Sequence, residues 1–554
     1  MSTDAPSPVS AGRQTSAGRI EGGIDAVVIG AGPNGLAAAA SLARAGARTV
    51  LLGATADIGG DGRRREIAPG VVVNDGEHLV SHLDATLISE LGLYKHGVEY
   101  AARRLDTTYF FDDEPTITLS GDPTQGFQSP DVAALPHAAA FQRFFDEMIR
   151  GAGLLAPALA GPRFGGKGAT LDEIIERADD EMRPRLMRYA SASVDAVLEP
   201  VFDGGAFRDL LTAEATFRQG AGPHEPFSFL GLIKRFSGES AGLQGAVAYP
   251  VGGPAAVVDA LRRVVQNARV DIRAPVKVRD IIIEYDKVAG VELAGGGQIR
   301  TSIVVYAESV QSLLSNALGA EDVDIEYQRR VARPAGAIAS AQALIKLTKA
   351  PSAGDEASAL ANRLVYAPPA AALRKSFNDA RAGAVPEKLA VEAIFPGAIE
   401  RAGADDNDDI APVLSAIAHP LPFDPAPSQE TMDAVEKAVF DNLELIAPGL
   451  AKHIDVAEIR FAAGAGGVFG APSPAVKDEK DAKSVLLTAA PRGPAPANVF
   501  DQWARANAAA TASDVDGLFF CGPEAEIGVG LSCTAGRAAA AAALRYGRKK
   551  GRVS

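Results

Sequence analysis

Three glycines near the N-terminus have the spacing of a nucleotide-binding turn. Gly30, Gly32 and Gly35 lie between a short apolar run, residues 24–30, and an alanine-rich segment, residues 34–45, that predicts a helix. At this spacing the first glycine allows a tight turn, the second lets the backbone approach a pyrophosphate, and the third lets the helix pack closely on the strand. The free N–H groups and the positive dipole end of the helix would face the phosphates. The alternative is a glycine turn with a structural role alone.

A second pair of glycines, Gly59 and Gly60, follows a strand predicted at residues 48–52. This pair would allow another close approach of the backbone to the same phosphates. The arginines at 63–65 come next. They would either place positive charge beside a pyrophosphate or form a solvated basic loop.

Length and composition indicate a globular protein of more than one domain. The chain has 554 residues, of which 47% are hydrophobic and 22% charged, and such a length usually exceeds one core. The formal net charge of −14 argues against a nucleic-acid partner. The two cysteines, Cys521 and Cys533, form no disulfide framework and are expected to be buried small hydrophobes in a reducing compartment.

The remaining features favour a cytoplasmic protein without a metal. His78 and His82 are four residues apart, but no third ligand stands nearby in a metal-binding pattern, so we expect no metal. Residues 1–23 predict a disordered tail, and no apolar run is long enough to span a membrane. The basic segment 545–554 is either a solvated helix end or a peripheral contact with the inner face of a membrane.

The other predicted helices and strands form the framework that would position these residues. Helical patterns dominate from about residue 83 to 210. Residues 249–315 predict a helix and then short strands, with a hairpin turn at the three glycines 295–297. Residues 330–500 mix strands with a long helix, and 517–547 repeat the strand, glycine turn and helix of the opening motif.

The segments "VVIGAGPNGLAAAASLARAGARTVLL", "DGEHLVS" and "YPVGGPAAVVDAL" occur in that order, followed by "VKVRDIIIEYDKVAGVELAGGGQIRTSIVVYA" and "GLFFCGPEAEIGVGLSCTAGRAAA". Together they resemble the phytoene desaturase-like flavoproteins, a branch of the amine oxidase and glutathione reductase-type FAD superfamily. The branch that is most similar is that of the pyridine nucleotide-disulphide oxidoreductase-domain relatives. The resemblance covers nearly the whole chain.

The resemblance implies an α/β fold, in which a Rossmann-type FAD-binding domain is interleaved with an α+β substrate domain. After the tail, the expected parts of the FAD-binding domain are residues 24–125, 246–325 and 505–554, and those of the substrate domain are 126–245, which is mainly helical, and 326–504.

The resemblance also implies the residues that would hold FAD. Those expected at the pyrophosphate, the adenine and the flavin edge are Gly30, Gly32, Pro33, Asn34, Gly35, Gly59, Gly60, Val278, Gly522, Gly528, Gly530 and Leu531. A helix that starts near Ser532 would aim its N-terminus at the flavin, where its dipole stabilises the anionic reduced form.

The sequence departs from the family at positions that would face the cofactor. Gly53 stands where the family ends its second strand with an acid that binds the adenosine ribose. The closing motif is also altered, and "YAE" at 306–308 replaces a common Ser-Asn-Ala. The substitutions in the closing motif are Pro523, Glu526, Ile527 and Val529.

Two functions follow. The first is an FAD-dependent dehydrogenase or desaturase that passes a hydride from an apolar, isoprenoid-like small molecule to flavin N5, a reaction that needs no protein nucleophile. No catalytic side chain is identified, and Phe227, Phe229 and Trp503 are either substrate-wall or core residues. The alternative is a cofactor-poor or cofactor-free relative that acts as a binding, isomerising or assembly protein.

Overall fold

A computed structural model describes most of the chain. The described residues are 20–21, 23–74, 76–121, 130–133, 135–162, 169–319, 325, 338–351, 357–402, 412–424, 427–462, 484–489, 515–527 and 531–551. Most of the expected N-terminal tail, Trp503 and residues 528–530 of the closing motif lie outside them.

A parallel five-stranded sheet carries the glycine turn. Its strand order is β12-β3-β2-β16-β23, and neighbouring strands all run parallel. The strands are β2 (Ala26–Ile29), β3 (Thr49–Leu52), β12 (Asp271–Arg273), β16 (Val304–Tyr306) and β23 (Leu518–Phe520). The chain therefore returns to this sheet from stretches that lie far apart in the sequence, which confirms the expected Rossmann-type α/β architecture.

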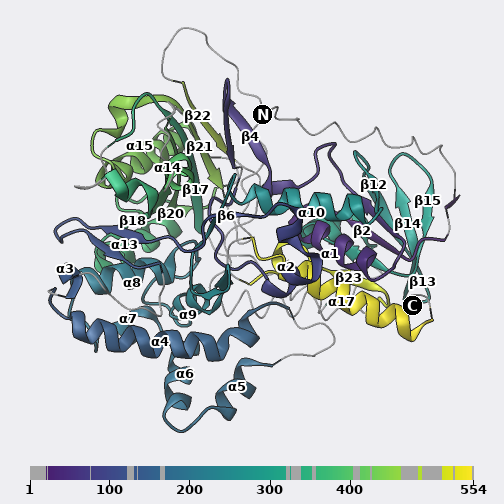
Figure 1. Ribbon diagram of the computed structural model, residues 1–554, viewed down its shortest axis with the longest axis horizontal. Helices are drawn as coiled ribbons and strands as arrows, with labels where there is room; N and C mark the ends of the chain where they lie inside the picture. Colours follow the sequence, from purple (N-terminus) through teal and green to yellow (C-terminus); the bar gives the residue numbers. More distant parts are fainter. Residues whose placement is uncertain are drawn as a thin grey trace.

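Three helices pack around this sheet (Figure 1). They are α1 (Pro33–Arg44), α10 (Ala255–Asn267) and α17 (Thr534–Lys549). Helix α1 contacts both of the others, and its alanine-rich sequence lets them approach closely. The small helix α2 (Ala85–Leu91) also contacts α1. Buried aliphatic residues of the strands and helices form one continuous core here.

A smaller sheet flanks the parallel one and contains the predicted hairpin. Its order is β1-β15-β14-β13, with β1 (Ile20–Glu21), β13 (Val278–Glu284), β14 (Lys287–Leu293) and β15 (Gln298–Arg300). Gly296 and Gly297 have φ values of +85° and +92° in the turn between β14 and β15. Glycine adopts such values readily, so the turn that the sequence predicts at 295–297 is confirmed.

An eight-stranded mixed sheet forms the other half of the molecule, on the left of Figure 1. In spatial order its strands are β22 (Ser484–Ala489), β21 (Ile454–Ala462), β17 (Ile338–Leu347), β20 (Val413–Pro422), β19 (Ala390–Ile394), β18 (Arg363–Tyr366), β7 (Thr107–Phe110) and β8 (Ile117–Leu119). Helices α13 (Ala370–Arg381), α14 (Pro396–Arg401) and α15 (Gln429–Ile446) accompany it.

Strands β7 and β8 differ from the helical pattern that the sequence suggests after residue 83. They lie within 24–125, the range expected for the first part of the nucleotide-binding domain, yet β7 pairs with β18 of the eight-stranded sheet. The sequence does not predict these strands because they are short. Strands of three or four residues show too little alternation to be recognised.

A block of helices lies along the bottom of Figure 1 and packs against β7 and β18 through a second core. These helices are α3 (Pro130–Ala133), α4 (Ala138–Leu159), α5 (Leu171–Arg177), α6 (Met182–Ser191), α7 (Val194–Leu198), α8 (Ala206–Thr216) and α9 (Leu230–Ser237). Phe229 is fully buried in this core. Its aromatic ring is thus part of the packing rather than a substrate wall.

Short strand pairs and one more helical turn lie outside these sheets and helices. They are β4 (Arg64–Ala68) with β5 (Val71–Asn74), β6 (Tyr100–Ala102) with β11 (Tyr249–Pro250), β9 (Glu239–Ser240) with β10 (Leu243–Gln244), and α11 (Val310–Ser312). Within the described ranges, no helix combines the length and the apolar character that crossing a bilayer requires.

Candidate functional site

The glycine turn has the geometry of a phosphate cradle. Gly30 has a φ of +101°, and a Cβ on Gly35 would lie 1.8 Å from the Gly30 carbonyl oxygen, so both positions require glycine. A Cβ on Gly32, by contrast, would meet no heavy atom within 4 Å. The first hydrogen bond of α1 runs from Leu36 N to Gly32 O (2.9 Å). The N–H groups of Asn34 and Gly35 lie before the first hydrogen bond of the helix, so they can donate to an external anion.

The second glycine pair lies against this turn. Gly59 N donates to Ala31 O at 2.7 Å, and a Cβ on Gly60 would lie 3.1 Å from Gly32 Cα. Gly59 and Gly60 have φ values of +121° and +55°. The structure thus brings together the two glycine segments that the sequence assigns to one pyrophosphate.

The three arginines that follow are engaged elsewhere. Arg63 pairs with Asp57 at 3.6 Å, Arg64 pairs with Asp259, and Arg65 makes two hydrogen bonds to Glu458 at 2.8 and 2.9 Å. Each therefore faces a carboxylate of the chain itself. These contacts favour the structural interpretation of the basic run over a role beside phosphate.

The ribose end of the site offers no carboxylate at the expected position. Gly53 is buried, and its backbone bonds to the strand beside it through Arg273 O (3.0 Å) and Val276 N (2.7 Å). A Cβ here would lie 3.2–3.4 Å from side-chain atoms of Ala31, Ala274 and Ile58. An acid at this position would have to displace neighbours that are already in contact.

The nearby acid Asp57 does not replace the missing one. Its side chain is 59% exposed and pairs with Arg262 at 3.1 Å as well as with Arg63. Val278, expected at the adenine, is half-buried at the start of β13 and pairs with Leu293. Val276, two positions earlier, donates its backbone N–H to Gly53 O at the end of β3.

The closing motif approaches the same region from the C-terminal end of the chain. Cys521 N donates to Tyr306 O at 2.8 Å, and a Cβ on Gly522 would lie 1.9 Å from Glu308 O, so this glycine is sterically required. Leu531 is buried in the core of the nucleotide-binding half. Gly528, Gly530 and Val529 lie outside the described residues.

Glu526, noted in the sequence only as a substitution, holds the N-terminus of α17. Its carboxylate accepts a hydrogen bond from Ala535 N (3.1 Å) and another from Ser532 Oγ. The Asn34 side chain donates to it as well, while Asn34 Oδ1 accepts from Gly536 N at 3.1 Å. Glu526 and Asn34 thus tie the first turns of α1 and α17 together.

Removal of the Glu526 carboxyl from water raises its pKa, although the hydrogen bonds from Ser532, Ala535 and Asn34 act in the opposite direction. Its anionic form nevertheless sits where a helix dipole favours negative charge. The resemblance assigns the same helix end to the flavin. The chain therefore supplies its own anion at one end of the cofactor site and lacks an acid at the other, while the central pyrophosphate cradle fits a dinucleotide.

The eight-stranded sheet turns a polar face toward this region. Side chains alternate along a strand, and one set joins the apolar core with α15. The opposite set is buried and includes several polar side chains, and three of these contact the segment that follows β5. Gln342 Nε2 donates to Gly76 O (2.8 Å), and His78 pairs through its two ring nitrogens with Ser415 Oγ (3.0 Å) and Glu392 (2.8 Å).

Arg363 is the centre of the charged network on this face. It is 3% exposed and forms ion pairs with Glu214 of α8 and Glu392 of β19. Burial alone would raise the pKa of Glu392, but Arg363 and His78 outweigh it and hold the pKa well below its usual value. The same balance, with Arg363 and Arg235 as the cations, lowers the pKa of Glu214.

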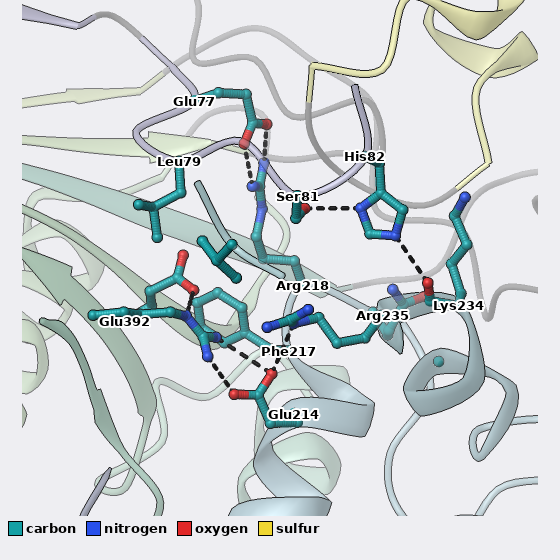
Figure 2. A pocket seen from close by; sticks show the side chains of 14 residues that line it. Glu77, Leu79, Ser81, His82, Glu214, Phe217, Arg218, Lys234, Arg235 and Glu392 are labelled. Atoms are coloured by element: carbon teal, nitrogen blue, oxygen red, sulfur yellow. Dashed lines mark hydrogen bonds and ion pairs between the residues drawn. The ribbon is translucent and has the colours of Figure 1, made fainter. Parts of the chain in front are cut away.

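Tyr109 completes the network by donating to Glu214 Oε1 at 2.7 Å, and burial together with that carboxylate raises the pKa of its phenol. A cavity of about 70 Å³ opens beside these groups (Figure 2). Its lining residues are Glu77, Leu79, Ser81, His82, Glu214, Phe217, Arg218, Gln219, Gly231, Lys234, Arg235, Val247, Arg363 and Glu392.

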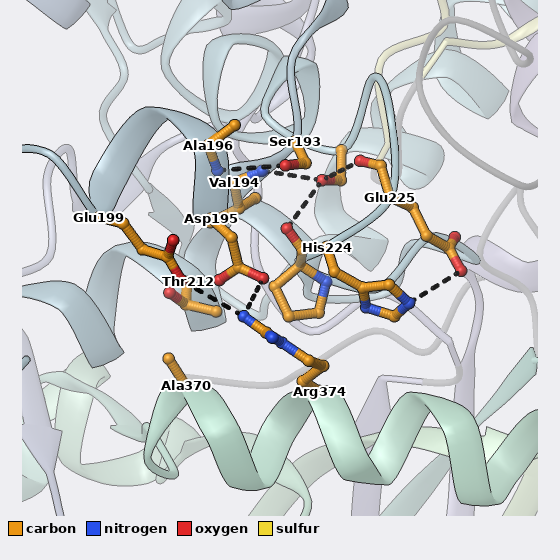
Figure 3. A network of polar contacts seen from close by, with 12 residues as sticks. Ser193, Val194, Asp195, Ala196, Glu199, Thr212, His224, Glu225, Ala370 and Arg374 are labelled. Carbon is orange, nitrogen blue, oxygen red and sulfur yellow. Dashed lines mark hydrogen bonds and ion pairs between the residues drawn. The ribbon is translucent and has the colours of Figure 1, made fainter.

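A second polar cluster has a structural role (Figure 3). Asp195 on α7 accepts from Arg374 of α13 at 2.6 Å and from Arg208 of α8 at 3.4 Å, and Glu199 also accepts from both arginines. Ser193 caps α7 by accepting from Ala196 N. These contacts fasten α13 to the helical block.

Sequence reasoning missed the charged network because its members are far apart along the chain. Glu214 and Arg363 are separated by 149 residues, and no local spacing links them. The available signal was an ionisable residue inside an apolar strand, as at Arg363 and at Glu392 in "LAVEAIF". Among the described residues, no cluster gathers three potential metal ligands.

Comparison with known proteins agrees with this geometry. Residues 28–90 match a family model described as an NAD(P)-binding Rossmann-like domain. The chain is 26% identical over 567 residues to the rat pyridine nucleotide-disulfide oxidoreductase domain-containing protein 2, covering 93% of this chain and 92% of that protein. The mouse protein of the same name is 25% identical, with coverage of 98% and 97%.

Solved structures show the same fold at low identity. Cyclohexylamine oxidase from Brevibacterium oxydans has a TM-score of 0.56 at 16% identity, and a putrescine oxidase bound to putrescine has 0.57 at 14%; each covers 96% of this chain and is itself covered completely. An oxidoreductase from Methanosarcina mazei has a TM-score of 0.55 at 14% identity, with coverage of 94% and 100%. These similarities confirm the resemblance to the pyridine nucleotide-disulfide oxidoreductase-domain proteins, and they show that the chain shares the fold of the amine oxidases.

Proposed function

We propose that this chain is an oxidoreductase that binds FAD on the parallel sheet and dehydrogenates a small-molecule substrate beneath the polar face of the eight-stranded sheet. The proposal is supported by the position of the glycine turn on the parallel sheet and by the buried, ionisable face of the eight-stranded sheet, which lie on neighbouring parts of the molecule. The relatives are oxidoreductases by name, which supports the reaction class without identifying the substrate.

The observation that carries the proposal is the open space at Gly32. Its neighbours Gly30 and Gly35 are glycine because any side chain would collide with the backbone, whereas a side chain on Gly32 would collide with nothing. Glycine at such a position has a reason when something outside the chain must approach the backbone. A pyrophosphate at the N-terminus of α1 is what this arrangement suits.

The roles of the chain's own residues follow from their positions. The N–H groups of Asn34 and Gly35 would hold the pyrophosphate, and Gly60 would let the second loop close over it. FAD, when bound, supplies a hydride acceptor at flavin N5. Arg363 and its partners would orient the substrate, and no protein nucleophile is required.

The nature of the substrate is the less constrained part of the proposal. The resemblance implies an apolar, isoprenoid-like small molecule. The cavity beside Arg363 is lined by charged side chains, which favours a substrate with at least one polar end. A peripheral contact of the basic C-terminal segment with an anionic membrane, in a cytoplasmic protein, stays a prediction.

A cofactor-poor binding or assembly protein is the second candidate function. Two observations favour it: the position of the ribose-binding acid is a closely packed glycine, and Glu526 already occupies the N-terminus of α17. An acid that accepts hydrogen bonds from a ribose is worth about 1.5–3 kcal/mol, so its absence weakens FAD binding by one to two decades. A loss of affinity of this size would lower the fraction of protein that carries FAD but would not abolish FAD binding.

Purification of the full chain separates the two functions. We expect a visible flavin spectrum, or a colourless protein that becomes yellow on titration with FAD, and chromatography of the released cofactor should identify FAD. Titration with NAD⁺ serves as the comparison because the family model that matches the turn is named for NAD(P). A protein that takes up no FAD at millimolar concentration would contradict the oxidoreductase and support the binding protein.

A further inference from the structure

The cavity beside Arg363 has a wall whose arginines and glutamates neutralise one another. Three cations and three anions of the lining are joined by ion pairs, all in side chains that are buried or nearly so. The pairs are Arg218 with Glu77, Arg235 with Glu214, and Arg363 with Glu214 and Glu392. Charges paired in this way fix the shape of the wall and leave no net charge for a ligand.

Lys234 is the additional cation of the lining. It is 5% exposed, and its ammonium donates to Leu159 O at 2.9 Å. An ammonium group has three hydrogens, so further donors remain. Among the residues that the structure describes, no carboxylate forms an ion pair with Lys234, in contrast to every arginine of the wall.

The histidine of the lining adds no charge. His82 Nε2 lies 2.8 Å from Lys234 O, and since a carbonyl can only accept, Nε2 carries the hydrogen. Its Nδ1 lies 2.8 Å from Ser81 Oγ and accepts from that hydroxyl. Burial, with Lys234 and Arg235 close by, lowers the pKa of His82 well below its usual value, so the ring is neutral.

Counted over its lining residues, the cavity carries one formal positive charge in excess, borne by a buried ammonium, and Glu526, outside the lining, is the carboxyl group whose charge acts on that ammonium. We propose that this cavity binds the carboxylate of a small-molecule acid, with Lys234 as its counter-ion. A volume of about 70 Å³ accommodates a carboxylate and a short hydrocarbon, and Leu79, Phe217 and Val247 supply apolar wall for the latter. A substrate with an apolar body and one carboxylate would fit both the apolar substrate that the resemblance implies and the charged lining of the cavity. Binding of the acid does not depend on the proposed function. Only the statement that this acid is the substrate rests on it.

The acid site can be tested with probes that differ in charge alone. Butanoate, butylamine and butanol have the same hydrocarbon chain, and their binding to the full-length protein can be compared by calorimetry, with and without added FAD. Butanoate should bind best. Lys234→Met removes the charge at similar length and should weaken butanoate binding on the order of tenfold to a hundredfold, the loss expected for a hydrogen bond to a charged group.

Lys375→Met is the matched control, because Lys375 lies on α13 with a side chain that is 74% exposed. This variant should bind butanoate like the unaltered protein. Equal binding of butylamine, no binding of butanoate, or full butanoate affinity in Lys234→Met would overturn the proposal. Butanoate binding without FAD binding would instead refute the proposed function and leave the acid site standing.

The pH dependence of butanoate binding gives a second readout that does not depend on a variant. Burial lowers the pKa of Lys234 to about 8, and the nearby charge of Glu526 acts in the opposite direction. Arg235 on the same helix stays charged, and His82 stays neutral. The affinity for butanoate should be constant near neutrality and fall about tenfold per pH unit above the pKa of Lys234. A flat profile through that range would contradict a role for this ammonium.

Discussion

Glu526 and Gly53 are the two residues that depart most clearly from the dinucleotide site that the glycine turn implies. At Gly53 the space for a ribose-binding side chain is filled by Ala31, Ala274 and Ile58. At Glu526 a carboxylate satisfies N–H donors at the N-terminus of α17. We propose that a flavin bound at this helix end would lie beside the Glu526 carboxylate, so that Glu526 would compete with it for the helix dipole.

Neutralising Glu526 should therefore tighten FAD binding. Glu526→Gln keeps a hydrogen-bond acceptor for Ala535 N but removes the charge, and a helix-end charge term of this kind corresponds to about a two- to fivefold change in affinity. A fluorescence titration with FAD measures it. Glu524→Gln is the control, since Glu524 lies in the same loop but accepts from Val310 N instead. Equal affinities of the two variants for FAD would contradict the proposal that Glu526 competes with the flavin.

The glycines of the turn should differ sharply in their tolerance of a methyl group. Gly35→Ala places a Cβ within 1.8 Å of Gly30 O and should lower the free energy of unfolding by about 1–3 kcal/mol or more. Gly32→Ala meets open space and should change it by about 0.5 kcal/mol at most. Urea denaturation of both variants tests the contrast. Similar losses in both would show that the turn is packed differently.

At the scale of elements, the eight-stranded sheet is fastened to the helical block by charge rather than by apolar contact alone. Arg363 of β18 reaches Glu214 of α8, which also receives hydrogen bonds from Tyr109 and Arg235. Breaking one partner of such a buried network leaves uncompensated charges.

Arg363→Met should therefore destabilise the protein by about 3–5 kcal/mol, as expected for an isolated buried carboxylate. The exposed pair between Arg150 and Asp179, each with a side chain 57% exposed, provides the matched control. Arg150→Met should cost about 0–1 kcal/mol, because water screens a surface pair. Chemical denaturation of both variants compares them directly, and equal costs would mean that the Arg363 network is solvated.

Elements with strong local patterns could be predicted from the sequence. The strand, turn and helix of 26–44, the hairpin around 295–297 and the C-terminal helix each rest on glycine placement and apolar periodicity within a short window. Strands β7 and β8 could not be predicted, because they are short and gain their stability from pairing with β18. The residues around Arg363 could not be grouped, because only the fold brings Glu214, Arg363 and Glu392 together.

At the scale of the whole molecule, the buried carboxylates make the free energy of unfolding depend on pH. The pKa values of Glu214 and Glu392 in the folded state lie below their usual value of 4.5. The stability that these carboxylates contribute is thus fully present above that value and is lost as the pH falls below it. Glu526 has a raised pKa, so its contribution changes in the opposite direction.

Because Glu214 and Glu392 lose their stabilising charge only below the usual glutamate pKa, the urea midpoint should fall as the pH is lowered from about 5 to about 3. Glu392→Gln should be less stable at neutral pH and show a shallower dependence, because its side chain no longer titrates. Urea titrations of both proteins over that range measure the effect. An unchanged slope in Glu392→Gln would show that other carboxylates govern acid unfolding.

The open space at Gly32 carries the proposed dinucleotide site, and an FAD titration of Gly32→Ala is its most direct test. Gly295→Ala is the matched control, because a Cβ on Gly295 also meets no heavy atom within 4 Å but lies in the hairpin turn between β14 and β15. We predict that both variants fold like the unaltered protein, and that Gly32→Ala alone loses FAD binding. Full FAD affinity in a folded Gly32→Ala variant would contradict the dinucleotide site.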